Sequence, residues 1–470
     1  MSFVDVSQRA RQVWSVLRLT PFDTSTDEER SKERYRRVIL GAAAFGTSKA
    51  ITALTTLISV PLTVNYLGAE RYGLWMTISS VIVMLGFADL GLGNGLVNAI
   101  AEAHGRDDRM AASRYVSSGF FMLLGVAVLI LVAFALAYRF VAWPWVFNVT
   151  SDAAAREAGP ALAVFVVCFA AGIPLGIVQR VQLGYQEGFA SSIWQSAGSL
   201  GGLVGVVLAI YHQVGLPWLV LAMSGAPVLA TAVNWMVQFL WRRPWLCPRW
   251  SQVDLGAGRK IANLGMLFLV LQLLTLMGSA SDNLIIAQMF GASAVAGYAV
   301  VQKLFSIALL SQFFVAPLWP AFGEALARHD YSWVARTLRR SILISVALGG
   351  CAALPLLVFG RQIIAFWAGG QLTPSIALLA GFAAHAVLGG YGGAMSAFLN
   401  SGSLLGRQVS FYGAASIAAL ILKVALARYW QVAGVIWATV IAYGTLYAIP
   451  SWLLSHQHLL HSRERSHAAR

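Results

Sequence analysis

Long runs of apolar residues, separated by short polar connections, make up most of the chain from residue 38 onward. A helix needs about 20 mainly apolar residues to cross the hydrocarbon core of a membrane, because each residue adds only about 1.5 Å. Twelve stretches meet this requirement, and they lie at residues 38–65, 73–99, 116–142, 160–184, 189–211, 217–241, 261–289, 298–325, 341–364, 376–401, 408–428 and 433–454. The pattern predicts an all-α integral membrane protein.

The composition excludes several classes of soluble protein. Only 11% of the 470 residues are charged and 58% are apolar, which leaves too little charge to coat a water-soluble globule. The net charge of +14 would suit nucleic acid only on a soluble basic domain, so we expect no nucleic-acid partner. Three widely spaced cysteines, Cys168, Cys247 and Cys351, are interpreted as packing residues and predict neither a disulfide framework nor a metal site.

The distribution of basic residues predicts the orientation of the chain. Of the 33 Lys and Arg residues, 25 fall on one side of the predicted spans, five on the other, and three within spans. The positive-inside rule therefore places both termini in the cytoplasm. Residues 1–37 form a cytoplasmic segment, for which an interfacial helix is one interpretation, and residues 20–37 are interpreted as a solvated linker.

The chain contains a sign of internal duplication. Four charged residues after the second span recur at a constant offset of 222 after the eighth: Glu102, Arg106, Asp108 and Arg114 match Glu324, Arg328, Asp330 and Arg336. Six-helix repeats are necessarily parallel, so we expect two lobes, at 38–241 and 261–454, around a central cavity, with a linker at 242–260 and a tail at 455–470. Two similar lobes favour transport by alternating access.

Two segments in each half carry a family resemblance. Pro61–Trp75 with Ala88–Gly95, and Asp282–Ile286 with Gly297–Lys303, resemble the corresponding helices of Wzx-type polysaccharide flippases. This family belongs to the multidrug, oligosaccharidyl-lipid and polysaccharide superfamily, and the similarity covers roughly residues 38 to 454. The resemblance implies a carrier rather than an enzyme, without a cofactor. It would flip a polyprenyl-diphosphate-linked oligosaccharide across the bacterial cytoplasmic membrane, beside membrane lipids and, as a further hypothesis, polysaccharide polymerase machinery.

Charged residues inside predicted spans are the first site candidates, because each costs on the order of 3 kcal/mol unless it has a partner or a cavity. Lys49 and Asp89 lie near mid-depth on adjacent helices, where they would pair or line the cavity. Asp282 and Lys303 are expected to pair near the outer side. Asp89 and Asp282 are candidates for binding a coupling proton or sodium ion. For Lys423 we expect the side chain to reach headgroup water.

A polar cluster ends the fourth span. Gln179, Gln182 and Gln186 share a helix face, and Arg180 lies among them. Amide and guanidinium groups suit sugar hydroxyls and phosphate, and the alternative is a cytoplasmic cap that holds the next loop. Lys49, Arg180 and Lys303 together predict a positively charged cavity lining that attracts an anionic cargo.

The remaining alternatives differ in chemistry. The Gly91–Gly95 run lacks the lysine and the strand of a phosphate-binding loop and is interpreted as close helix packing. A related multidrug antiporter shares the helix count, but its cationic cargo favours acidic cavity walls. A membrane glycosyltransferase or ligase needs catalytic acids in a large outer loop, and residues 143–159 offer only Asp152 and Glu157. A scaffold for the polysaccharide machinery is a third alternative.

Overall fold

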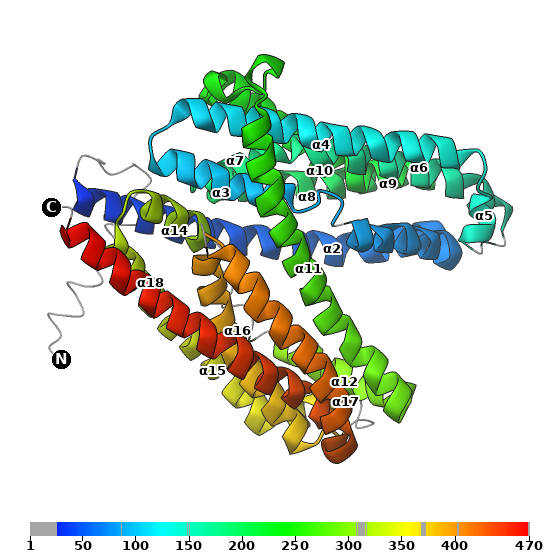
Figure 1. Cartoon of the computed structure of the whole chain (residues 1–470). Coiled ribbons are helices and arrows are strands. Elements are labelled where there is room, and N and C mark those ends of the chain that lie inside the picture. Colours follow the sequence, from blue (N-terminus) through cyan, green and yellow to red (C-terminus); the bar gives the residue numbers. More distant parts are fainter. Residues whose placement is uncertain are drawn as a thin grey trace, which may run out of the picture. The chain divides into compact units, whose positions relative to one another are not determined.

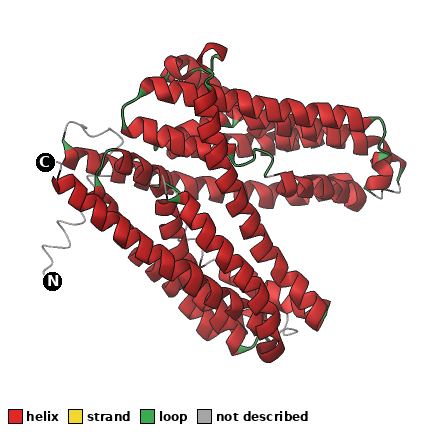
Figure 2. Ribbon diagram, in the orientation of Figure 1, coloured by secondary structure: helices red, strands yellow, loops and turns green. Residues whose placement is uncertain are grey.

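Helices account for all the regular structure that the computed structural model describes (Figure 2). The described residues are 26–85, 87–147, 149, 151–306, 308, 315, 317–367, 373–401 and 404–468. The interfacial helix expected before residue 20 lies outside them. Within the described residues, nine helical stretches are long and apolar enough to cross a membrane. The predicted all-α membrane fold is confirmed.

The nine stretches correspond to ten of the twelve predicted spans. The stretch Leu405–Leu459 is long enough for two predicted spans, and its helix α17 (Leu405–Tyr443) loses helical geometry at Trp430 and Gln431. Two further predicted spans, 73–99 and 298–325, are not among the nine stretches. The first is interrupted between Leu85 and Leu92, and the second includes residues outside the described ones.

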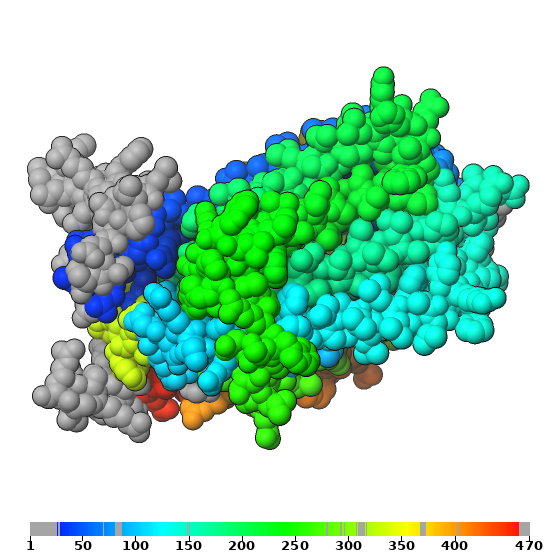
Figure 3. Space-filling model, turned by 90° about the horizontal axis from the view of Figure 1, so that it is seen from above, coloured from blue at the N-terminus to red at the C-terminus, as the bar shows by residue number. Residues whose placement is uncertain are grey.

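The chain divides into two compact units, residues 1–266 and 267–470. The predicted lobe and linker boundaries at 241, 261 and 454 stay predictions. In the first unit, α2 lies beside α8, α8 beside α10, and α4 beside α6 (Figure 1). Seen from above, the blue to green segments of this unit lie against one another (Figure 3). Its elements are α2 (Asp27–Leu85), α3 (Leu92–Gly105), α4 (Arg109–Tyr138), α5 (Trp143–Val146), α6 (Asp152–Leu175), α7 (Ile177–Gly184), α8 (Gly188–Tyr211), α9 (Leu216–Val220), η1 (Leu221–Gly225), α10 (Ala226–Met236), η2 (Val237–Arg242), η3 (Pro244–Leu246), η4 (Trp250–Gln252) and the start of α11 (Leu255–Phe290).

The second unit continues from α11. Helix α16 packs between α15 and α17, and a core of buried apolar residues that includes Phe305 and Phe382 lies among its helices. Its further elements are α12 (Ala292–Phe305), α14 (Leu318–Ala327), α15 (Tyr331–Trp367), α16 (Ile376–Leu399), α17, η6 (Gly444–Ala448) and α18 (Ile449–Ala468).

One turn has the same backbone geometry in both halves, as the predicted duplication requires. Gly68 has φ 74° and ψ 171°, and Gly291 has φ 85° and ψ 169°. Both glycines stand where one helix gives way to the next in a conformation that side chains disfavour.

The charged turn also recurs. Arg106 pairs with Glu102 at 2.9 Å, and Arg328 pairs with Glu324 at 2.6 Å. In each turn the residue before the repeated aspartate is left-handed, with φ 55° at Asp107 and 60° at His329. The repeated aspartates, Asp108 and Asp330, then accept a backbone N–H three residues on, as helix caps do. Loop geometry therefore repeats with the sequence, which supports duplication.

The solvated-linker interpretation is wrong for residues 27–37. Helix α2 begins at Asp27 and runs on into the first predicted span without a break. Glu33 is only 3% exposed and Arg36 only 6%, because these charges pair with one another and pack against the protein. Charge content alone does not distinguish a solvated face from a paired one.

Candidate functional site

The second predicted span is broken in its middle. Helix α2 ends at Leu85 and α3 starts at Leu92, with Leu90 at φ 52° and Gly91 at φ 72° in the turn between them. Asp89 holds this turn, because its Oδ1 accepts the Gly91 backbone N–H at 3.0 Å. Irregular backbone at this position in a span is tolerated only against protein or water, so the break marks a place with a special role.

Arg180 of α7 lies against this turn. Its Nη1 donates to Asn94 Oδ1 at 3.0 Å, and its Nη2 lies 3.6 Å from Asp89 Oδ2. The close approach depends on Gly93, where a Cβ would lie 2.6 Å from Arg180 Nε. We refer to Asp89, Gly93, Asn94 and Arg180 as the Arg180 cluster.

The Arg180 cluster is partly open to solvent. The side chain of Arg180 is 38% exposed and that of Asp89 22%. Among the described residues, the Arg180 side chain makes one hydrogen bond, to Asn94, since 3.6 Å exceeds hydrogen-bond range. A guanidinium carries five N–H donors, so most of them remain for a ligand. This arrangement suits recognition of a phosphate or carboxylate group.

The predicted Lys49–Asp89 ion pair is wrong. The structure gives Asp89 a different partner, Arg180, because the fold brings α7 rather than mid-α2 against the broken turn. Lys49 is exposed, with its Nζ 5.3 Å from the centre of the Phe45 ring. A cation–π contact of this kind is weak at an exposed position. The predicted role of Lys49 in cargo binding stays a prediction.

The three glutamines of the fourth span have different surroundings. Gln182 is 1% exposed and exchanges two hydrogen bonds with Asn234 of α10, at 2.7 and 3.1 Å. Gln179 donates a long hydrogen bond of 3.5 Å to Thr231, which also lies on α10. Gln186 lies beyond the end of α7, is buried, and has a left-handed φ of 60°. Two of the amides therefore connect α7 to α10, and their part in cargo binding stays a prediction.

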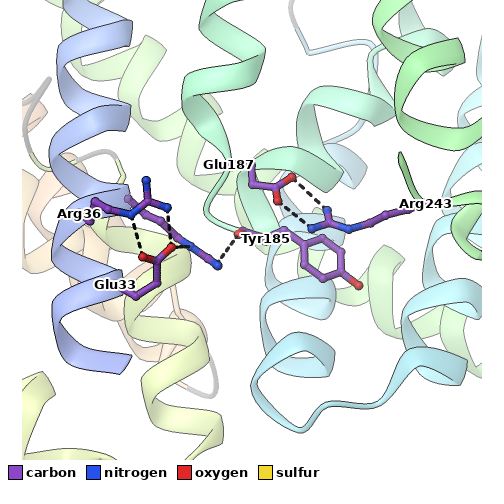
Figure 4. Close-up of polar contacts among 6 residues, drawn as sticks. Glu33, Arg36, Tyr185, Glu187 and Arg243 are labelled. Carbon is purple, nitrogen blue, oxygen red and sulfur yellow. Dashed lines mark hydrogen bonds and ion pairs between the residues drawn. The ribbon is translucent and has the colours of Figure 1, made fainter. Parts of the chain in front are cut away.

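A charged network beyond the Arg180 cluster was missed by the sequence analysis. Glu33 accepts two hydrogen bonds from Arg36, both 2.7 Å, and one from Arg37 at 2.8 Å (Figure 4). Arg37 also donates to the Tyr185 carbonyl oxygen at 3.3 Å. The start of α2 is thereby joined to the turn after α7.

The same turn is joined to the end of η2. Arg243 donates two hydrogen bonds to Glu187, at 2.7 and 3.0 Å, and stacks 4.1 Å from the Tyr185 ring centre (Figure 4). Burial raises the pKa of Tyr185 to about 12, against the opposing effect of the Arg243 charge. The Tyr185 side chain therefore stays neutral, and its ring packs against the Arg243 guanidinium. No sequence signal pairs these residues, because Glu187 and Arg243 are far apart along the chain.

In the second unit the predicted Asp282–Lys303 pair is also wrong. Asp282 pairs with Lys423 of α17 at 2.5 Å, and Lys303 is exposed near the end of α12. The expectation that Lys423 reaches headgroup water is wrong as well, because its side chain is 1% exposed. The roles of Lys303 in cargo binding and of Asp89 and Asp282 in ion coupling stay predictions.

The glycine run at Gly91–Gly95 packs as the sequence analysis predicted. A Cβ on Gly95 would lie 2.5 Å from the Ile261 carbonyl oxygen, and one on Gly265 would lie 3.1 Å from the Gly91 backbone. Helix α3 therefore crosses the first turns of α11 almost backbone to backbone. The described residues contain no group of three or more His, Cys, Asp or Glu side chains that could hold a metal ion.

Comparison with known proteins supplies the family. A family model described as polysaccharide biosynthesis protein matches residues 39–326, which is more than half of the chain. The chain belongs to this polysaccharide biosynthesis protein family. It is also similar to a Salmonella typhi protein named "Putative O-antigen transporter", with 23% identity over 325 residues, 67% of this chain and 71% of the relative.

Solved structures show the same fold as this member of the polysaccharide biosynthesis family. One is the outward-facing conformation of a multidrug resistance MATE family transporter of the MOP superfamily, with a TM-score of 0.75 and 16% identity. Another is a MOP superfamily transporter from Pyrococcus furiosus, titled for the reverse polarity of its binding pocket, with a TM-score of 0.73 and 14% identity. Each comparison covers 92% of this chain and 97% of the other.

Together these similarities confirm the predicted relationship to Wzx-type flippases. The family member described here is a multi-pass helical membrane protein. The family model ends at residue 326, whereas the likeness seen in the sequence extended to about 454. The solved structures cover most of that remainder at the level of fold.

Proposed function

We propose that this chain translocates a polyprenyl-diphosphate-linked oligosaccharide from the cytoplasmic to the outer leaflet of the bacterial cytoplasmic membrane. It would act by alternating access, in the biosynthesis of cell-surface polysaccharide. The O-antigen relative and the polysaccharide family support this cargo class. The single observation that carries the proposal is the half-exposed Arg180 guanidinium beside a broken membrane helix.

The chemistry of the Arg180 cluster suits the diphosphate. A phosphate oxygen within hydrogen-bond range would compete well with Asp89, whose oxygen is 3.6 Å from the guanidinium. Arginine presents a planar fork that matches two phosphate oxygens at once. We propose Lys49, Lys303, Gln179, Gln182 and Gln186 as further cargo contacts, and Asp89 as a residue that binds a coupling proton or sodium ion.

The wider setting follows from the same proposal. Both termini would lie in the cytoplasm, and the protein would act as a carrier without enzymatic activity of its own. Lipid-linked oligosaccharide and membrane lipids would be its molecular partners, and polysaccharide polymerase machinery would consume the translocated cargo.

The fold of MATE transporters favours one second candidate, an ion-coupled multidrug antiporter. The two functions predict opposite cargo charges. A cationic drug is repelled by an open guanidinium, so the Arg180 cluster supports the polysaccharide carrier.

Deletion of the gene tests the proposal. Loss of surface polymer together with lipid-linked oligosaccharide retained in the cytoplasmic leaflet supports a flippase. Hypersensitivity to cationic drugs with normal polymer supports the antiporter and contradicts our proposal.

Replacement of Arg180 tests the site. Arg180→Ala at normal protein level should reduce export about tenfold or more, because a hydrogen bond to a charged group is worth about 1.5–3 kcal/mol. Arg180→Lys should recover only part of the activity, since lysine lacks the fork. Arg114→Ala, which removes an exposed arginine of α4, is the matched control and should export normally. Equal export by Arg180→Ala and Arg114→Ala would remove Arg180 from the site.

A further inference from the structure

The Lys423 ammonium of the second unit is enclosed by oxygen atoms. Its Nζ donates to the Gly278 carbonyl at 2.7 Å and to Ser281 Oγ at 3.0 Å, and lies 2.5 Å from Asp282 Oδ1. The ammonium thus donates two hydrogen bonds, and its contact with Asp282 is an ion pair. The three contacted residues come from one turn of α11, whereas Lys423 comes from α17 (Figure 1).

The carboxylate in this enclosure is held from its other side. Tyr298 of α12 donates its hydroxyl proton to Asp282 Oδ2 at 2.7 Å. Tyr298 is fully buried and packs against Phe382 of α16, with ring centres 5.1 Å apart. The oxygen atoms around Lys423 are therefore positioned by the core of the second unit and not only by the lysine.

The three oxygens have the chemistry of a cation site. A carboxylate, a backbone carbonyl and a hydroxyl are oxygen ligands of the type that hard metal cations take. Because Asp282 is 6% exposed, its charge requires a permanent positive partner at this depth. In this chain a side chain of the protein itself provides that partner.

We propose that the Lys423 ammonium is a resident cation, which occupies a site on α11 that would otherwise bind a sodium ion. The second unit is then stable without external sodium at this position. Removal of the ammonium converts Gly278, Ser281 and Asp282 into a sodium-binding site. Asp282 is then the fixed partner of a resident ammonium, which takes the place of the sodium-coupling role predicted for this residue from the sequence.

The test is sodium-dependent stability of Lys423→Ala in the purified full-length protein. Thermal unfolding is measured in sodium chloride and in choline chloride at equal ionic strength. A ligand that binds only the folded protein raises its melting temperature, so the variant should melt several degrees higher in sodium. Wild type should melt at the same temperature in both salts.

Two controls isolate the site. Arg428→Ala removes an exposed basic residue from the same helix and should show no sodium effect. The double variant Lys423→Ala with Asp282→Asn removes the carboxylate charge as well, and should lose the sodium effect of the single variant. Lys423→Ser is a second test variant that supplies a hydroxyl oxygen in place of the ammonium.

Several results would overturn the proposal. Wild type that melts higher in sodium than in choline would show that the ammonium does not substitute for sodium. If Lys423→Ala and Lys423→Ser melt equally in both salts, or cannot be recovered folded in sodium chloride, sodium cannot take the place of the ammonium. Melting does not depend on cargo, so this test is independent of the proposed flippase function.

Discussion

Two contacts of unequal strength hold Arg180. The hydrogen bond to Asn94 is 3.0 Å long, whereas Asp89 lies at 3.6 Å and uses its other oxygen for the Gly91 N–H. Less free energy is needed for a loosely paired cation to exchange its partner for an incoming anion than for a cation in a tight bidentate pair. Arg71 and Glu157, by contrast, form a bidentate pair at 2.7 and 2.8 Å, which is the geometry of a structural link. This difference in pairing distinguishes Arg180, a candidate binding group, from Arg71, a structural link.

Gly93→Ala should impair export while leaving the protein folded. The new Cβ would overlap Arg180 Nε and Asp89 Oδ2, at 2.6 and 2.8 Å, so the guanidinium must move. The displaced atoms end flexible side chains, so we expect a stability loss below about 1 kcal/mol. Export of lipid-linked oligosaccharide should fall toward the level of Arg180→Ala. Gly125→Ala, on an open face of α4, should export normally, and an equal result for both variants would contradict the importance of this geometry.

Among the elements, α3 is the helix whose position the candidate site depends on. It carries Asn94 after the break, and its glycines allow it to cross the start of α11 at close range. On another side, the Gln182–Asn234 pair connects α7, which carries Arg180, to α10. Two helices that form the Arg180 cluster are therefore each held by a neighbour, α3 by the start of α11 and α7 by α10.

Gly95→Ala should destabilise the first unit. Its Cβ would lie 2.5 Å from the Ile261 carbonyl oxygen and 2.9 Å from the Gly265 nitrogen, and neither backbone atom can turn aside. Overpacking of this kind costs about 1–3 kcal/mol. A lower melting temperature of the purified protein in detergent would confirm the crossing. Gly73→Ala, where no atom lies within 4 Å, is the control, and equal melting of the two variants would show that the helices separate readily.

For the whole molecule, duplication explains why the same backbone conformations occur twice. The left-handed residues Asp107 and His329, and the glycines Gly68 and Gly291, mark corresponding places in the two units. Repeats of an even number of spans keep the same orientation in the membrane. The orientation itself follows from the excess of basic residues on one predicted side.

Reporter fusions test that orientation. Alkaline phosphatase is active only outside the cytoplasm, so a fusion within residues 143–159 should be active and one within 242–260 inactive. β-Galactosidase fused at the same positions should give the reverse pattern. Phosphatase activity in the 242–260 connection would overturn the predicted topology and, with it, the direction of transport.

Most of the fold was predictable from the sequence. The helix count, the membrane environment and the duplication depend on composition and on spacing along the chain, since a span must be apolar over its whole length. The polysaccharide family relationship was visible in motifs from both halves. Arg180 was identified because it lies among three glutamines at the end of the fourth predicted span, where amide and guanidinium groups suit sugar hydroxyls and phosphate.

The partners of the intramembrane charges were decided only by the tertiary structure. The sequence places Lys49 and Asp89 at similar depth, yet it contains no information on how the helices are rotated about their axes. Rotation turns Asp89 toward Arg180, and Asp282 toward Lys423, across 91 and 141 residues of chain respectively. Depth is a one-dimensional property of a span, whereas an ion pair requires two side chains to meet in three dimensions.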